Sequence, residues 1–130
     1  MKTISKILRQ LTLLMVIALA SLSAKADSYY WVGGSGNWSD FASHWATTSG
    51  GSTFRTQVPT SNDDVFFDAN SFTATGQIVN ANNTIVFFRN MDWTGANFNP
   101  QLLQSTTSSN INVFGSLTLI PAMNFNVLGS

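Results

Sequence analysis

Short apolar runs bounded by polar residues constrain the fold of this chain more than any other feature. Three apolar side chains within residues 123–127 are separated by asparagines, and other short apolar runs occupy residues 85–88, 111–114 and 117–120. A period of two places alternate side chains on one face of a β-strand. Beyond the N-terminal region, no ten-residue segment has the helical period of about 3.6 residues. The sequence therefore predicts an all-β fold.

The composition supports this prediction. Only 9% of the residues are charged, against roughly 25% in a typical soluble domain, and the chain has no glutamate. Helices usually cover their solvated face with Glu, Lys and Arg, so this composition argues against a helical bundle. The chain also lacks cysteine, which excludes disulfide scaffolds, thiolate zinc sites and cysteine nucleophiles.

Residues 1–26 have the pattern of a secretory signal peptide. Three positive charges lie within the first nine residues, an apolar stretch covers 11–20, and Ala24 and Ala26 are the small residues at −3 and −1 of a cleavage site. The uncharged run 11–24 is 14 residues long, shorter than the ~20 residues of a membrane-spanning helix. We therefore predict no transmembrane anchor and a secreted, extracellular protein, associated with the cell surface.

The remaining residues 27–130 are acidic. They contain two arginines and six aspartates, a net charge of −4 with His44 neutral. Nucleic acids and anionic lipids must be met by a surplus of Lys and Arg. Nucleic-acid binding is therefore not expected.

A weak internal repeat suggests how the strands are arranged. Residues 84–93 align without a gap on residues 116–125, an offset of 32 that places Met91 on Met123. Repeats of fixed spacing indicate stacked units, each of which buries its apolar face against its neighbours. Strands about five residues long with Asn, Ser and Gly turns fit a parallel β-helix, a solenoid wound from short strands.

The two parts of this solenoid differ in character. Residues 27–76 are rich in aromatic residues, Gly and Ser, and we predict that they cap the N-terminal end. Residues 77–130 are predicted to form the β-solenoid repeats, and the pattern breaks off at Ser130 without a polar closing segment. We therefore expect a solenoid that is incomplete, and hence truncated, at the C-terminus.

Several motifs resemble a known family. These are the Tyr-Trp-Val-Gly-Gly-Ser-Gly-Asn-Trp-Ser-Asp segment at 30–40, His44-Trp45, the Val-Pro-Thr-Ser-Asn-Asp-Asp-Val-Phe-Phe-Asp segment at 58–68, and residues 91–96 and 114–119. They resemble the N-terminal region of large secreted surface proteins of Bacteroidetes-type bacteria, which often carry a C-terminal sorting or gliding-motility-associated domain. The resemblance implies an adhesin-like β-solenoid without a defined activity. If the chain is a fragment of such a protein, we expect it to continue into further repeats.

An aromatic cluster in the cap region has two interpretations. Exposed rings of Tyr30, Trp31, Trp38 and Trp45 would form a platform for glycans, because flat rings stack on the apolar faces of sugars. The alternative is a packed cap, in which large rings bury area that would otherwise be missing from the end of a solenoid. The packed cap is the favoured interpretation.

The aspartates at 63, 64 and 68 also have two interpretations. Asp63, Asp64 and Asp68 offer the hard oxygen ligands that calcium prefers, although their spacing does not match an EF-hand loop. The alternative is turn chemistry, in which such side chains bond the backbone just before the strand predicted at residues 65–67. Turn chemistry is favoured.

No catalytic residues are predicted. His44 is the only histidine, and a lone imidazole rarely makes a transition-metal site, so we expect no cofactor. We predict a secreted or cell-surface structural, adhesin-like module without catalytic activity, with extracellular glycans or surface polymers as its partners. The alternative is a carbohydrate-binding or polysaccharide-degrading β-helix protein that uses the N-terminal aromatic residues.

Overall fold

The computed structural model describes residues 1–7, 9, 25–82, 85–107 and 109–127. The apolar part of the predicted signal peptide and Ala24 lie outside the described residues, whereas residues 2–7 and 9 are helical. Within the described ranges, no helix combines the length and the hydropathy needed to cross a bilayer.

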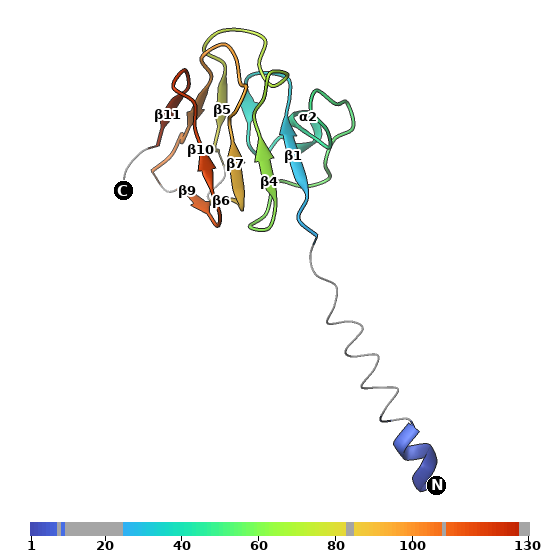
Figure 1. Cartoon of the computed structure of the whole chain (residues 1–130). Coiled ribbons are helices and arrows are strands. Elements are labelled where there is room, and N and C mark those ends of the chain that lie inside the picture. Colours follow the sequence, from blue (N-terminus) through green and yellow to red (C-terminus); the bar gives the residue numbers. More distant parts are fainter. Residues whose placement is uncertain (8, 10–24, 83–84, 108, 128–130) are drawn as a thin grey trace.

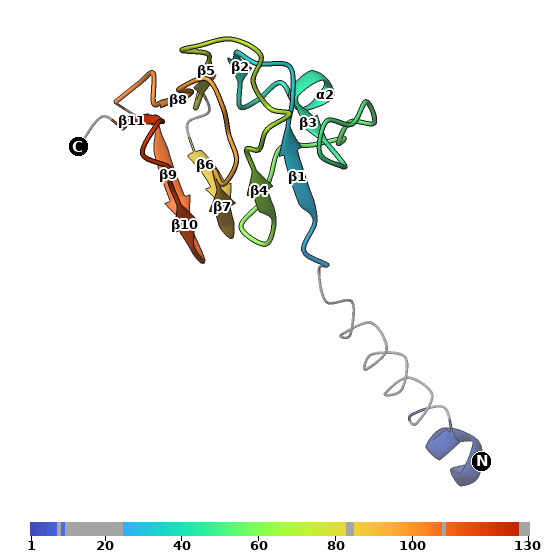
Figure 2. The ribbon, with the colours of Figure 1, turned by 45° about the horizontal axis from the view of Figure 1, so that its top comes forward.

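Three sheets form the folded part of the chain, and sheet A is the largest. It contains five strands in the order β10 (Leu117–Thr118), β7 (Asn90–Asp92), β4 (Asp64–Phe66), β1 (Ser28–Trp31) and β3 (Trp45–Ala46). Figure 1 shows β1, β4, β7 and β10 side by side, and Figure 2 shows the same succession from another angle. All of these pairings are parallel except that of β1 with β3.

Sheets B and C are smaller and entirely parallel. Sheet B has the order β11 (Asn124–Asn126), β8 (Gln101–Leu103), β5 (Ile78–Asn80) and β2 (Gly36–Asn37), and sheet C pairs β6 (Ile85–Phe88) with β9 (Asn110–Val113). The short helix α2 (Phe41–His44) leads into β3. The all-β class predicted from the sequence is confirmed.

The chain visits the three sheets in a fixed rotation. From β4 to β11, successive strands belong to sheets A, B, C, A, B, C, A and B. Strands β1 and β2 make an earlier passage through sheets A and B, so both sheets contain strands from either side of residue 76. Parallel neighbours within a sheet are therefore distant in sequence, because the chain contributes strands to the other sheets between them.

The register differs from the repeat predicted at an offset of 32. In sheet A, Val65 pairs with Met91 and Met91 with Leu117, each 26 residues on. In sheet B, Leu102 pairs with Phe125, 23 residues on, and the offset in sheet C is 25. Met123 is not the register partner of Met91, because Met91 lies in β7 of sheet A and Met123 immediately precedes β11 of sheet B. The prediction of a 32-residue repeat is thus wrong.

Residues that share a register position form columns of inward-facing side chains. One column runs through Val65, Met91 and Leu117, and another through Val79, Leu102 and Phe125. The first two members of each column are at most 1% exposed. Apolar residues thus stack on apolar residues between the sheets, and this stacking makes the core.

The C-terminal end of each column is open to solvent. Leu117 is 39% exposed, Phe125 36% and Val113, which follows Phe88 in sheet C, 40%. Strands β10, β11 and β9 are the last strands of sheets A, B and C on this side. Within the part of the chain that the structure describes, no further apolar layer covers their inward-facing side chains.

Several predicted strands are confirmed, and one segment is corrected. The runs at 85–88, 117–120 and 123–127 contain β6, β10 and β11, and the run at 111–114 overlaps β9, which begins one residue earlier. Residues 101–104, the segment most similar to a helix in the sequence, instead contribute β8. Leu102 is buried in its column while Gln101 and Leu103 flank it, which is the inside–outside pattern of a strand.

Candidate functional site

Three of the aromatic residues in the predicted cap region are packed inside the protein. Trp31 and Trp45 are fully buried and Trp38 is 1% exposed. The ring of Trp45 makes edge contacts with Trp31 at 4.9 Å and with Trp38 at 4.8 Å between centroids. The structure therefore corrects the glycan-platform expectation for these three rings, because a buried ring has no free face for a sugar.

Hydrogen bonds and a tight turn hold this cluster. The indole N–H of Trp31 donates to the Gly34 carbonyl at 2.7 Å, and that of Trp45 donates to the Trp38 carbonyl at 3.0 Å. Gly34 has φ of +76°, in the left-handed region that glycine adopts without cost. The imidazole of His44 stacks on Trp31 at 4.6 Å. His44 thus packs against this aromatic cluster.

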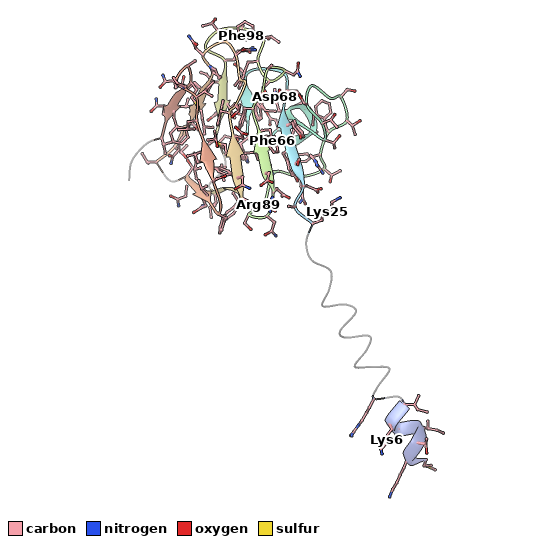
Figure 3. All side chains as sticks on the ribbon, viewed as in Figure 1. Lys6, Lys25, Phe66, Asp68, Arg89 and Phe98 are labelled. Carbon is pink, nitrogen blue, oxygen red and sulfur yellow. The ribbon has the colours of Figure 1, made fainter. Side chains whose placement is uncertain are left out.

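Tyr30 is the one member of the predicted platform that faces outward. It is half-buried, and its ring stacks on Phe66 of the neighbouring strand with centroids 5.0 Å apart and planes at 18°. Figure 3 labels Phe66, which lies in β4 of sheet A. The stacking occupies one face of the Tyr30 ring with a protein side chain.

Asp63 is a turn residue at the beginning of β4. Its carboxylate accepts hydrogen bonds from the backbone N–H and the hydroxyl of Thr60, at 2.8 and 2.7 Å, and from the backbone N–H of Asp27 at 3.0 Å. The residue is 5% exposed. Burial of the neighbouring Tyr29 hydroxyl, together with the charge of Asp63, raises the pKa of Tyr29.

Asp64 begins a polar ladder on the outer side of sheet A. Arg89 and Asn90 donate to its carboxylate, and the Asn90 amide oxygen accepts from the backbone N–H and hydroxyl of Ser116 at 2.7 and 2.9 Å. The hydrogen bond from Arg89 is the main cause that lowers the pKa of Asp64, with a further contribution from Asn90. The same pair raises the pKa of Arg89. The ladder links β4, β7 and the segment entering β10.

The three calcium candidates do not converge. Asp68 accepts a hydrogen bond from the backbone N–H of Asn70 at 2.9 Å, which is local turn chemistry. Asp63 is engaged by Thr60 and Asp64 by Arg89. Among the described residues, no group of three or more His, Cys, Asp or Glu side chains could hold a metal ion. The turn interpretation accounts for Asp63 and Asp68.

A shallow hollow of about 350 Å³ lies on the outer side of sheet B. It is lined by Ser35, Gly36, Asn37, Ile78, Asn80 and Leu103. The Asn80 amide N–H donates to the Asn37 side chain at 3.1 Å, whereas its own buried amide oxygen has no hydrogen-bond partner among the described residues. The sequence offered no signal for this site, because its residues come from three strands that are far apart in the chain.

Comparisons with known proteins provide no identification. No family model, curated protein or solved structure matches the chain.

Proposed function

We propose that this chain is a secreted, non-catalytic structural module, the capped N-terminal end of a right-handed parallel β-helix from an adhesin-like surface protein. The rotation of strands through sheets A, B and C supports the solenoid, because each sheet then gains one parallel strand per turn. The motifs shared with Bacteroidetes-type surface proteins support the adhesin-like assignment. The aromatic cluster from Trp31 to Trp45 would be the cap.

The observation that carries this proposal is that polar side chains on neighbouring strands are hydrogen-bonded to one another. The outer sides of the sheets carry ladders that run from strand to strand, such as Asp64–Asn90–Ser116 and Asn37–Asn80. Hydrogen bonds of this kind fix successive turns of a rod. Polar groups committed to such bonds favour a rigid, projecting structure with an Asn-, Ser- and Thr-rich surface that adheres to extracellular polymers.

A second candidate function is carbohydrate binding at the hollow of sheet B. Its amide groups and the apolar side chains of Ile78 and Leu103 combine the polar and apolar surfaces that a sugar presents. The amide side chains of Asn37 and Asn80, which are hydrogen-bonded to each other at 3.1 Å, lie beside these apolar groups in the lining of the hollow. This observation relocates the carbohydrate alternative from the buried tryptophans to sheet B.

Two measurements on the chain secreted by a bacterial host test these functions. Beads coated with the protein are expected to be retained on polysaccharide-coated surfaces in proportion to coating density. Calorimetric titration with soluble oligosaccharides is expected to give no saturable heat. Retention no greater than that of uncoated beads would contradict the adhesive module.

Saturable heat that is lost in Asn80→Ala, and kept in the exposed control Asn97→Ala, would instead establish the second candidate. Calorimetry is used because the tryptophans that dominate the fluorescence are buried.

A further inference from the structure

Asp27, the residue that follows the predicted cleavage site, is held at three points. Its backbone N–H donates to Asp63 Oδ1 at 3.0 Å, and its carbonyl accepts from the backbone N–H of Asp64 at 2.9 Å. Its carboxylate pairs with the guanidinium of Arg55 at 3.1 Å. Lys25, two residues earlier, is exposed, and Figure 3 shows it below the start of β1. The folded part of the chain thus begins at the predicted new N-terminus.

The carboxylate of Asp63 is buried among neutral donors. The ion pairs found among the described residues are Arg55–Asp27 and Arg89–Asp64, and Asp63 belongs to neither. Its partners are the backbone N–H of Asp27 and two groups of Thr60. A buried carboxylate that forms no ion pair is costly, so a cation at the position of the Asp27 nitrogen would be favoured.

We propose that Asp63 binds the α-ammonium group that removal of residues 1–26 creates at Asp27. This inference rests on the export that forms part of the proposed function. Hydrolysis of the Ala26–Asp27 peptide bond consumes one water, leaves Ala26 as a carboxylate and leaves the Asp27 nitrogen as an amine that takes up a proton. Because this nitrogen already lies 3.0 Å from Asp63 Oδ1, cleavage replaces a neutral donor by a cation without moving β1.

The other charged and titratable groups nearby do not outweigh the attraction between the α-ammonium group and Asp63. Two cations oppose the α-ammonium group: Arg55, which pairs with the carboxylate of Asp27, and Arg89, whose charge also interacts with that of Asp63. Asp64 is paired with Arg89, and the hydroxyl of Tyr29 is neutral because burial raises its pKa. An α-ammonium beside a carboxylate has a pKa above the ordinary value of about 7.7–8.0. The stability it adds is therefore present below that value and lost as the pH rises through the higher folded pKa.

The sequence allows a direct test, because residues 27–130 contain no lysine and the α-amino group is their only amine. The full chain is secreted by a bacterial host, and mass spectrometry identifies its first residue. The rate of acylation by acetic anhydride is then measured against pH, for the folded chain and for the chain in urea. We expect the folded rate profile to lie at higher pH, with about tenfold slower acylation at neutral pH for each unit of displacement.

Two variants separate ion pairing from simple burial. Asp63→Asn is expected to return the pH profile to that of the unfolded chain, whereas Asp68→Asn, which alters only a local turn bond to Asn70, is expected to leave it displaced. Circular dichroism checks that each variant is folded. The wild-type comparison stands without Asp63→Asn if that variant does not fold. Identical pH profiles for the folded and unfolded wild-type chain would overturn the proposal.

An N-terminus other than Asp27 would contradict the predicted export site and not the capture by Asp63. In that case the same acylation profile is measured on a chain released from a fusion so that it begins at Asp27. All strands from β1 to β11 lie within this chain. Coincident folded and unfolded profiles there would overturn the capture itself.

Discussion

Met91 and Leu117 occupy the same register position on neighbouring strands of sheet A, yet Met91 is 1% exposed and Leu117 is 39% exposed. The difference comes from their place in the column. Met91 lies between Val65 and Leu117, whereas β10 is the last strand of its sheet. Apolar burial, and with it the stabilisation of about 25 cal/mol per Å², therefore decreases toward the C-terminal end.

This gradient predicts unequal costs of truncation. Met91→Ala is expected to lower the free energy of unfolding by about 2–5 kcal/mol, because it leaves a cavity inside the column. Leu117→Ala is expected to cost at least about 1 kcal/mol less, because solvent already reaches that side chain. Urea denaturation followed by circular dichroism measures both values. Equal costs would contradict the stacking of columns.

The buried indole N–H groups of Trp31 and Trp93 give a second prediction. The buried N–H of Trp93 has no partner among the described residues, whereas the N–H of Trp31 donates to the Gly34 carbonyl. Both rings are fully buried. Trp31→Phe is therefore expected to cost about 1–2 kcal/mol more than Trp93→Phe, which removes an unsatisfied donor. Denaturant midpoints of the two variants test this difference.

A third prediction concerns Gly36. A Cβ at this position would lie 2.2 Å from Nε2 of His44, whose ring is held by Trp31 and whose Nδ1 bonds the Val32 carbonyl at 2.6 Å. Gly36→Ala is expected to destabilise the fold by about 1–3 kcal/mol through this clash. In a His44→Ala background the same substitution should cost less than about 1 kcal/mol. A cost that does not change with the background would exclude the clash as its cause.

The Asp64–Arg89 pair predicts a dependence of stability on pH. Its hydrogen bonds lower the pKa of Asp64 from 3.8, so the folded state holds the carboxylate more strongly ionised than the unfolded chain does. The resulting stability is present above pH 3.8 and is lost as the pH falls through the lower folded pKa.

Substitution of Asp64 tests this sign. The free energy of unfolding of Asp64→Asn should lie below that of the wild type at neutral pH and approach it below about pH 3. Asp40→Asn is the control, since Asp40 is exposed and accepts hydrogen bonds from Asn37 and Ser39. A difference between the wild type and Asp64→Asn that is constant with pH would contradict this account.

The sequence predicted the strands better than it predicted their partners. The alternation of Asn124, Phe125 and Asn126 marks β11 because one strand face is apolar. The register could not be found in this way, because turns of different length between the sheets give offsets of 26, 23 and 25. The similarity of Met91 and Met123 therefore suggested a repeat between strands that belong to different sheets.

Burial and long-range contacts also could not be predicted from the sequence. Trp31 and Trp45 carry no local mark that distinguishes a packed ring from an exposed one, and they are covered because β1 and β3 pair. The contact of Asp27 with Asp63 spans 36 residues, and the hollow at Asn80 combines β2, β5 and β8. Such sites depend on the stacking of strands, which only the folded chain brings together.

Engineered disulfides test the stacking most directly, because the chain has no cysteine of its own. Asp92 and Thr118 are register partners on β7 and β10, whereas Asp92 and Asn124 are the pair that a 32-residue repeat would align. Neighbouring strands are about 4.8 Å apart, within the Cα separation of about 4.4–6.8 Å that a disulfide requires. We expect Asp92→Cys with Thr118→Cys to cross-link in the folded chain, and Asp92→Cys with Asn124→Cys to remain reduced. Cross-linking of the second pair in place of the first would contradict the account.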